Sequence, residues 1–303
     1  MRTSRIESFR RAATATAAIA ALAAAAPAFA GISITPTTTP SALGSFVTGS
    51  GLTVDSTTIV TGDAAQFGTF SNFSGSKINV GSGVVLSTGK VSSITGVDGI
   101  TPSGEFGGAG TPEFDAYAAG RVTNFQDSHD VASLKLTFTL ATASAVSFSF
   151  VFGSVEFPEF TGKFTDAFLT FLDGTAASNQ IVFDASNKPV QVGSSFASSL
   201  TTADTSTVFT DPHGLLGPLT TTTGLLAAGT HTLLFEVGDV NDDELDSAVF
   251  LTGLGVASGG GDGPPVTTPG GPITTPVPEP GTYALMLGGL GVVGFTARRR
   301  KKA

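Results

Sequence analysis

Hydrophobic and polar residues alternate along much of the chain between residues 31 and 256. Over 134–140, Leu and Phe at every second position are separated by Lys and Thr, which predicts a strand with one face in solvent. The phenylalanines at every second position of 148–152 would place three rings on one side of a strand. Segment 168–172 is almost entirely apolar, as in a central strand covered on both faces. These segments predict the core of a β fold.

Shorter segments complete the predicted fold. Further strands are expected over 84–87, 181–183, 232–237 and 248–254. Residues 113–121 could form a short helix, whereas 94–110 is Gly-rich and predicts a long loop. After residue 30, no segment keeps a convincing 3.6-residue period. We therefore expect an all-β protein, an antiparallel β-sandwich of jelly-roll-like form with few short helices.

Composition and charge narrow the class of protein. Charged residues are 13% of the 303, and the chain has no cysteine, which excludes disulfides, thiolate nucleophiles and Cys-ligated metal sites. Nine of the 15 basic residues lie near the two ends, and between residues 31 and 277 there are 22 acidic but only 6 basic side chains. A body this acidic repels polyphosphate, so we expect no nucleic-acid partner.

The N-terminus has the order of features that is typical of a secretory signal peptide. Four arginines precede an Ala-rich apolar run over 12–26, and small residues at Ala28 and Ala30 are followed by Gly31. We expect residues 1–30 to be the signal peptide, with cleavage by signal peptidase between Ala30 and Gly31. The general secretory route and the twin-arginine route both stay open as export machinery.

The C-terminus divides into three further parts. Residues 257–276 are a Gly/Pro/Thr tract, too poor in apolar residues to form a core, and predict a linker. Pro278, Glu279 and Pro280 then precede an apolar segment over 281–297, which is about the minimum length for a membrane span. Five basic residues end this region at 298–302, a cluster expected to stay on the cytoplasmic side.

This C-terminal region, 277–303, resembles the PEP-CTERM sorting signal of Gram-negative bacteria, in which a Pro-Glu-Pro motif, a hydrophobic span and a basic tail are recognised by an exosortase. The resemblance implies an inner-membrane-anchored precursor that is then delivered to the cell surface or the extracellular matrix. The hydrophobic span alone would also suit a plain C-terminal membrane anchor. Both interpretations place residues 31–256 outside the cytoplasm.

Acidic side chains are densest over 239–246. Six of these eight residues carry side-chain oxygens: Asp239, Asn241, Asp242, Asp243, Glu244 and Asp246. Calcium suits such a segment because it takes six to eight oxygen ligands in flexible geometry, although the Gly and the late Glu of an EF-hand are absent. The alternative is a solvated acidic turn in which Asp246 accepts hydrogen bonds from backbone amides at the start of the next strand.

A second group of carboxylates includes Glu156, Glu159 and Asp166. A glycan hydrolase would pair Glu156 with Glu159 or with Asp166 across a cleft. Glu156 and Glu159, however, flank Pro158 and would leave an extended strand on opposite faces. We therefore expect no catalytic residues. The seven candidate calcium ligands are Asp239, Asn241, Asp242, Asp243, Asp246, Glu156 and Asp166.

The three histidines show no spacing typical of a zinc site. His231 falls within a predicted strand, where a partly buried and hydrogen-bonded imidazole is expected. His129 and His213 lie beside loop aspartates, so we expect both to be exposed.

Three ordered blocks, 51–89, 148–174 and 235–251, resemble the choice-of-anchor L domain family. The second block, FSFVFGSVEFPEFTGKFTDAFLTFLDG, is similar to a family pattern F-x-Y-V-F-x-S-E-E-Y followed by F-N-D-x-F-x-F-F. The third block matches a closing pattern D-x-x-D-x-x-x-D-S-A-V-F-L. The resemblance covers about 45–256 and implies a secreted β module carried on alternative surface anchors, with no established catalysis.

The chain departs from the family pattern at several polar positions. Val155 stands where the family has the first of two glutamates, and Thr165 stands where it has an asparagine. Phe157 and Phe160 replace tyrosines. No role that needs the first carboxylate or a phenol hydroxyl can be carried over to this chain.

The sequence thus predicts an exported, non-enzymatic surface or extracellular-matrix protein that is sorted by an exosortase. We expect a structural or adhesive role, associated with exopolysaccharide or a biofilm. A calcium-dependent glycan- or protein-binding module is the first alternative, and a secreted glycan hydrolase is the second. No cofactor is expected other than the possible calcium ion.

Overall fold

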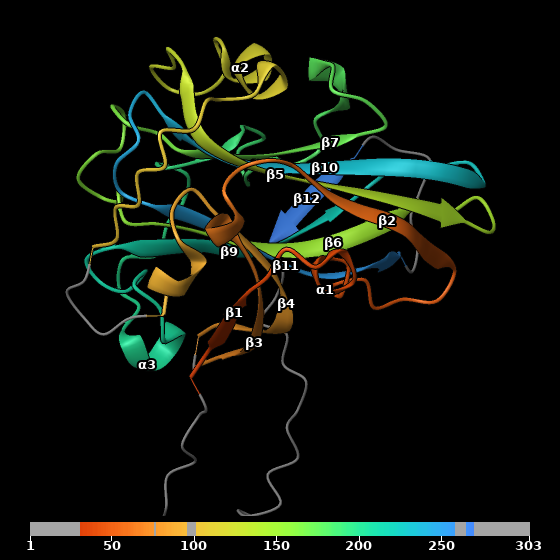
Figure 1. Ribbon diagram of the computed structural model, residues 1–303, viewed down its shortest axis with the longest axis horizontal. Helices are drawn as coiled ribbons and strands as arrows, with labels where there is room; N and C mark the ends of the chain where they lie inside the picture. The colour runs from red at the N-terminus through yellow and green to blue at the C-terminus, as the bar shows by residue number, and fades with distance from the viewer. Residues whose placement is uncertain (1–30, 76, 96–100, 258–264, 270–303) are drawn as a thin grey trace, which may run out of the picture. The chain divides into compact units, whose positions relative to one another are not determined.

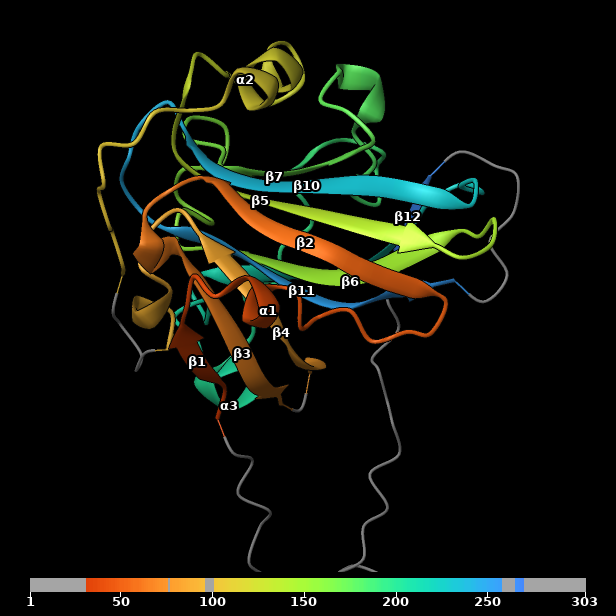
Figure 2. The same ribbon diagram turned by 45° about the vertical axis from the view of Figure 1, so that its right-hand side comes forward.

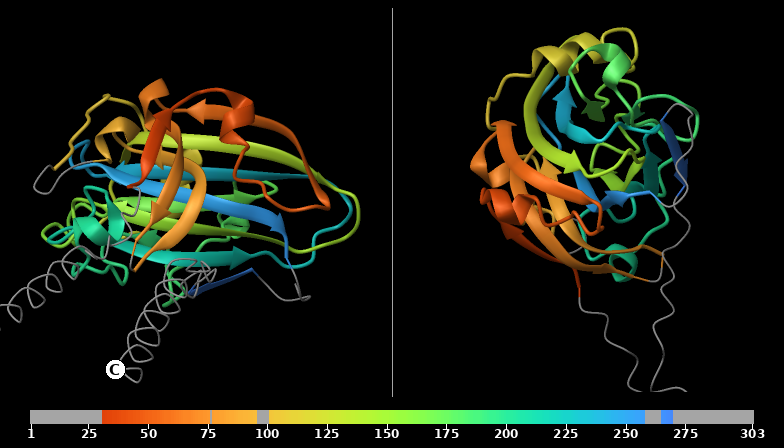
Figure 3. Two further views of the ribbon diagram at one scale, coloured as in Figure 1. Left: turned by 90° about the horizontal axis from the view of Figure 1, so that it is seen from below. Right: turned by 90° about the vertical axis from the view of Figure 1, so that its right-hand side faces the viewer.

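Two antiparallel sheets form the protein in the computed structural model, which describes residues 31–75, 77–95, 101–257 and 265–269. The sheets lie face to face (Figures 1 and 2), and the view along the strands shows the two layers end-on (Figure 3, right). The helices of the described part are all short. The predicted all-β antiparallel sandwich with few short helices is confirmed.

The strand order follows from the register of the pairs. The seven-stranded sheet has the order β1 (Ser33–Pro36), β3 (Phe67–Ser74), β4 (Asn79–Ser87), β11 (Ser247–Val256), β6 (Val146–Ser154), β9 (Gly214–Thr222), β12 (Val266–Pro269). The five-stranded sheet has the order β2 (Leu52–Thr61), β5 (Ser128–Leu140), β10 (Gly229–Val240), β7 (Ala167–Leu172), β8 (Val190–Gln191).

Phenylalanine rings fill the space between the two sheets. The three rings of β6 all belong to the central core, as the alternation predicts. Phe148 packs edge-on against Phe235 of β10 with ring centroids 5.2 Å apart, and Phe150 packs against Phe168 of β7 at 5.1 Å. Burial of such large apolar side chains is the main source of stability in a sandwich that has no disulfide.

Each sheet also has a covered outer face. Helix α2 (Pro112–Ala118) lies over the five-stranded sheet (Figure 1), where Phe114 and Tyr117 join a second apolar cluster with residues of β7 and β10. Thr111 caps this helix by accepting a hydrogen bond from the Phe114 amide at 3.2 Å, and Pro112 suits its first turn. A third cluster, which includes Phe70, packs on the outside of the other sheet. Strand β7 is therefore covered on both faces, as predicted.

The remaining helical elements are single turns. The α-helices are α1 (Pro40–Leu43) and α3 (Thr202–Thr205), and the 3-10 helices are η1 (Ala64–Gln66), η2 (Val91–Ser93) and η3 (Ala177–Asn179). No helix in the described residues is long and apolar enough to cross a membrane. The predicted signal peptide, its cleavage site, the Pro-Glu-Pro motif and the predicted membrane span lie outside the described residues, Gly31 excepted.

Two predictions about secondary structure were wrong. Residues 181–183 do not form a strand, because the Gln180 side chain bonds both the amide and the carbonyl of Val182, at 2.7 and 2.6 Å. The predicted linker contains strand β12, which pairs with β9 through a Thr-rich register in which Thr267 lies opposite Thr221. Threonine and valine favour extended backbone, so this short stretch pairs although Val266 is its only large aliphatic residue.

Candidate functional site

Four acidic residues come from chain segments that meet at one end of the sandwich. Glu156 follows β6 and Asp166 immediately precedes β7, whereas Asp239 lies near the end of β10 and Asp246 immediately precedes β11. Ser154 at the end of β6 pairs with Ser247 at the start of β11, and Gly238 of β10 pairs with Ala167 of β7. Pairing of strand ends within each sheet therefore places the four acids at the same end.

These acids are buried, which is unusual for carboxylates. The exposed fraction is 0% for Glu156 and Asp166, 2% for Asp239 and 3% for Asp246. Asp242, in the loop between β10 and β11, is partly buried beside them. We call these five residues the sandwich-end cluster.

Asp166 is fixed at the centre of the sandwich-end cluster. Its Oδ1 accepts a hydrogen bond from the Val240 amide at 3.1 Å, and its Oδ2 accepts one from the Ser247 hydroxyl at 2.6 Å. The Asp166 carboxyl is also in hydrogen-bond contact with the carboxyls of Glu156 and Asp239. It therefore connects the segment after β6 with the end of β10.

Asp246 connects the cluster to the Gly-rich loop. Its Oδ1 accepts a hydrogen bond from the Gly104 amide at 2.6 Å, so the expected bonding to the start of the next strand was wrong. The carboxylate also lies directly against Gly89, where a Cβ atom would collide with it. Asp130 anchors the same loop by accepting hydrogen bonds from the amides of Phe106, at 2.7 Å, and Gly108.

Burial raises the pKa of every carboxyl in the cluster. Desolvation is the largest cause in each case, and neighbouring carboxylates such as Asp242 beside Glu156 add to it. The pKa values of Glu156, Asp166 and Asp239 lie well above the ordinary range, and those of Asp242 and Asp246 are raised to about 6. Hydrogen bonds and two more distant positive groups, Lys90 and His129, only partly oppose these shifts.

Three oxygens of the sandwich-end cluster have no hydrogen-bond partner. They are Oε1 of Glu156, Oδ1 of Asp239 and Oδ1 of Asp242. Buried oxygens of this kind are costly, since they have lost water and gained nothing in return. The carboxyls of the cluster therefore need cations or protons to neutralise them.

The predicted candidate ligands divide into two groups. Five of the seven, those of the sandwich-end cluster, lie together. Asn241 instead ties loops together: its amide donates to the carbonyls of Asn124 and Lys163, at 3.0 and 2.9 Å, and accepts from the Gln126 amide at 2.7 Å. Asp243 is half-exposed at the tip of the loop.

The solvated-turn alternative therefore holds only for that tip, because both ends of the acidic segment are buried. In the described residues, no three His, Asp or Glu side chains are already arranged around a common point that could hold a metal ion.

The carboxylate pairs of a hydrolase are not available to a glycan. Glu159 is exposed whereas Glu156 is fully buried, so these two residues do not share a cleft. Glu156 and Asp166 do lie together, but both are inaccessible. Two surface pockets, of about 540 and 310 Å³, are lined by other residues, and Asp184 is the only carboxylate among them.

A separate buried acid, Glu236, was not identified from the sequence. It lies on the outer face of β10 beneath α2, where its Oε1 accepts hydrogen bonds from Ser133 at 2.9 Å and Thr111 at 3.1 Å. Burial raises its pKa to about 7, and the nearby carboxylates Glu113 and Asp115 add to this shift. Alternation along β10 places residue 236 on the same face as the half-buried Thr232, so the sequence pattern gives no sign that Glu236 is fully buried.

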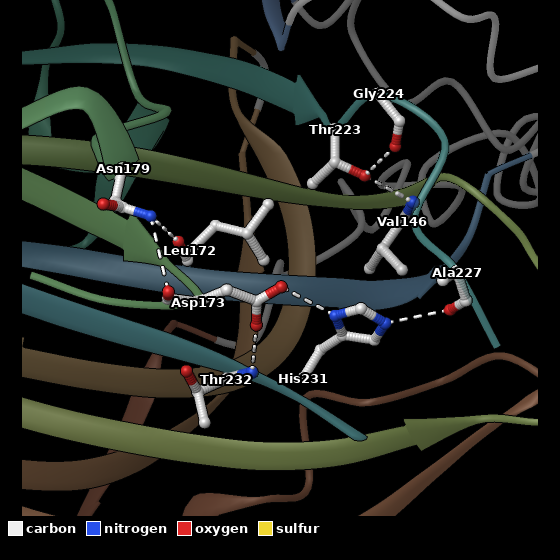
Figure 4. A network of polar contacts seen from close by, with 9 residues as sticks. All are labelled: Val146, Leu172, Asp173, Asn179, Thr223, Gly224, Ala227, His231 and Thr232. Atoms are coloured by element: carbon white, nitrogen blue, oxygen red, sulfur yellow. Dashed lines mark hydrogen bonds and ion pairs between the residues drawn. The ribbon is translucent and has the colours of Figure 1, made fainter. Parts of the chain in front are cut away.

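A third arrangement pairs an acid with a base (Figure 4). Nδ1 of His231 lies 2.7 Å from Oδ2 of Asp173, and Nε2 lies 2.9 Å from the Ala227 carbonyl. Asp173 also accepts a hydrogen bond from the Thr232 amide at 2.8 Å. The prediction of a partly buried, hydrogen-bonded His231 is confirmed.

The other two histidines are less exposed than expected, since both are half-buried and the side chain of His129 is 35% exposed. His129 lies in β5, where strand pairing restricts its exposure, and 3.4 Å separates it from Asp127. His213 lies 3.1 Å from the Phe157 carbonyl.

Comparison with known proteins agrees with this architecture. The PEP-CTERM protein-sorting motif matches residues 276–301, which include Pro278, Glu279 and Pro280, and implies export, processing by an exosortase and surface sorting in Gram-negative bacteria. No curated protein and no solved structure matches the chain. The Choice-of-anchor L domain matches residues 33–256, from the first strand to the end of β11. Because this match spans well over half of its length, the chain belongs to the choice-of-anchor L domain family.

Proposed function

We propose that the exported domain is a non-catalytic structural component of the outer surface or the extracellular matrix, and that it adheres to exopolysaccharide in a biofilm. The observation that carries this proposal is the burial of the acidic groups. A glycan hydrolase needs two carboxyl groups in contact with its substrate. Here the neighbouring carboxyls Glu156 and Asp166 are both 0% exposed, inside the end of the sandwich.

The outer face of the five-stranded sheet supports an adhesive role. Two rows of hydroxyls run across three strands, because the register aligns them: Thr53 with Thr139 and Thr230, and Ser56 with Thr137 and Thr232. All six residues are exposed or half-exposed. Within the first row, the hydroxyls of Thr139 and Thr230 are 3.1 Å apart. The hydroxyls of this surface can exchange hydrogen bonds with a polysaccharide, and the row includes one carboxylate, since Thr139 donates a hydrogen bond to Asp55 at 2.7 Å.

Fractionation of the cell tests the sorting part of the proposal. With its exosortase, the protein should lose the C-terminal segment and appear at the surface or in the matrix. Without the exosortase, the uncleaved precursor should stay in the inner membrane. A Glu279→Ala variant in the normal host should behave as the wild type does without the enzyme. An identical distribution in all three cases would contradict exosortase sorting.

Co-sedimentation with the host's purified exopolysaccharide tests the adhesive part. The wild type should sediment with the polymer, and Thr53→Glu with Thr230→Glu should reduce the bound fraction severalfold, because both positions are exposed in the hydroxyl rows. Thr268→Glu is the matched control, since it adds charge to an exposed threonine of the other sheet. Equal loss in the control, or no sedimentation of the wild type, would contradict adhesion through this face.

A reducing-end assay on the same polymer tests the non-catalytic part. The wild type should release no more reducing ends than a Glu156→Gln variant. Release that depends on Glu156 would instead support the hydrolase.

A further inference from the structure

The unpartnered oxygens of the sandwich-end cluster point to a ligand. Oε1 of Glu156 and Oδ1 of Asp239 belong to side chains that are 0% and 2% exposed, so water does not reach them freely. The third unpartnered oxygen, on Asp242, belongs to the same group of neighbours. Isolated orphan atoms elsewhere in a core are tolerated singly, but three on neighbouring carboxyls repel one another whenever these groups are ionised.

Within the described residues, no cationic side chain forms an ion pair with a carboxyl of the cluster. The ion pairs of the described residues are His129 with Asp127 and His231 with Asp173, and neither includes a member of the cluster. Lys90 acts at a distance on Asp246. Charges buried in proteins are normally paired or bind a metal. A bound cation would supply what the side chains do not.

We propose that a calcium ion binds at the end of the sandwich, between Glu156, Asp166, Asp239 and Asp242. The available donors are carboxylate oxygens, hydroxyls and backbone carbonyls, which are the ligands that calcium prefers, and there is neither cysteine nor a nearby histidine cage for zinc. Calcium also tolerates irregular coordination, whereas magnesium demands near-ideal octahedral geometry. This inference goes beyond the sorting and adhesion proposed above and does not depend on them.

The existing contacts indicate how the ion would be held. Asp166 is fixed by the Val240 amide and the Ser247 hydroxyl, so it is the rigid ligand. In the structure the carboxyls meet in pairs through Asp166 instead of converging on one point. Calcium binding therefore requires small side-chain movements that bring the unpartnered oxygens of Glu156, Asp239 and Asp242 around one point with Asp166. The ion would then tie the segment after β6 to the β10–β11 loop and hold the ends of both sheets together.

Calcium titration of the full-length protein in detergent, after treatment with EGTA, tests the site. For an extracellular module we take a dissociation constant of about 0.5 mM. About 5 mM calcium should then raise the melting temperature by roughly 3–6 °C, and the same concentration of magnesium should raise it less. Isothermal titration should show one calcium ion per chain. No heat of binding and no thermal shift up to about 10 mM would overturn the proposal.

Variants in which a single carboxyl is replaced by an amide test which residues bind the ion. Glu156→Gln and Asp239→Asn keep the shape and hydrogen bonding of protonated acids, so they should fold in EGTA but lose the calcium-dependent shift. Glu244→Gln, which neutralises an exposed acid of the same loop, should keep the shift. If a buried variant does not fold, Asp242→Asn serves instead because its side chain is only partly buried.

An undiminished shift in Glu156→Gln or Asp242→Asn would overturn the assignment, as would equal loss in Glu244→Gln. Exosortase processing and polysaccharide sedimentation in EGTA are separate measurements, so failure of the calcium site and failure of the proposed function can be distinguished.

Discussion

Strand β10 carries two buried acids, Glu236 and Asp239, whose surroundings differ. Glu236 lies on the outer face beneath α2 and accepts hydrogen bonds from two hydroxyls. Asp239 lies at the end of the strand, where it contacts the carboxyl of Asp166 and the hydroxyl of Thr88. A single proton on Glu236 removes its charge, whereas one proton leaves several charges in the sandwich-end cluster. Burial of an acid therefore says less about whether it binds a ligand than does the number of carboxyls that share the same hydrogen-bond donors.

This difference separates a structural acid from a candidate binding site. Desolvation raises the pKa of both acids, so the pKa alone does not distinguish them. What distinguishes them is that the cluster brings together buried acids next to strands of both sheets, while Glu236 is joined by half-buried acids of α2 and by hydroxyls. The first position offers a cation several buried carboxylates, whereas the second offers one buried carboxylate and the half-buried acids of α2.

The largest effect is expected at Asp166, in EGTA so that calcium makes no contribution. Asp166→Ala leaves the Val240 amide and the Ser247 hydroxyl without an acceptor inside the protein, which should lower the free energy of unfolding by about 3 kcal/mol. Asp166→Asn keeps one acceptor oxygen and removes a repelling charge, so its loss should stay below about 1 kcal/mol. Urea unfolding measures both. Equal stability of the two variants would show that Asp166 does not organise the cluster.

The next effect concerns Glu236 and depends on pH. Because its pKa is raised to about 7 in the folded protein, the folded state holds a proton that the unfolded state releases above about pH 4.5. Its favourable contribution is complete below the unfolded pKa and is lost as pH rises through the folded pKa. Glu236→Gln removes this dependence and should stabilise the protein by about 2 kcal/mol at pH 8.

Near pH 4.5 the same variant should match the wild type, because both then carry a neutral group. Urea unfolding at the two pH values measures the difference. Glu113→Gln is the control, since it neutralises a half-buried neighbour on α2 and should change the pH dependence only slightly. A variant that is less stable than the wild type at pH 8 would show that the ionised Glu236 is stabilised by its hydroxyl donors.

The sequence predicted the sandwich because burial in strands leaves a strong alternation. The rings of β6 and the apolar residues of β5 and β7 needed no knowledge of distant segments. The predicted strand over 181–183 was wrong because a side chain intervenes. The Gln180 side chain bonds the backbone groups of Val182 that a neighbouring strand would otherwise pair with. Hydrogen bonds of this kind depend on a rotamer, which alternation does not reveal.

The candidate site was only partly predictable. The density of oxygens over 239–246 left a calcium site and a solvated turn open, and the choice of Glu156 and Asp166 added the segments that the fold brings to the same place. The assignment of Asn241 and Asp243 was unsupported, because spacing along a loop does not say which side chains turn inward. Glu236 could not be found from alternation, since α2, which covers it, begins more than a hundred residues earlier in the chain.

The smallest effect is expected at Asp173, a more exposed acid that is paired with His231. The Asp173 side chain is 41% exposed and that of His231 is 11% exposed, so solvent weakens their attraction. Burial lowers the pKa of His231, but the hydrogen bond to Asp173 and the Ala227 carbonyl outweigh it, and the pKa is raised overall. A raised histidine pKa stabilises the fold below the unfolded pKa, and this contribution disappears as pH rises through the folded value.

Asp173→Asn removes the charge while Oδ1 still accepts the Thr232 amide, and asparagine tolerates the positive φ of 53° at this position. We expect a loss of about 0.5 kcal/mol in unfolding free energy at pH 5.5 and almost none at pH 9. Asp184→Asn, whose carboxylate accepts local hydrogen bonds from Ser186, Lys188 and Ser194, is a control without a histidine partner and should not show this pH profile. A loss that persists unchanged at pH 9 would mean that Asp173 acts through its backbone contact alone. If the loss instead disappears at pH 9, the charge of Asp173 is balanced by His231, a partner that the sandwich-end cluster and Glu236 lack.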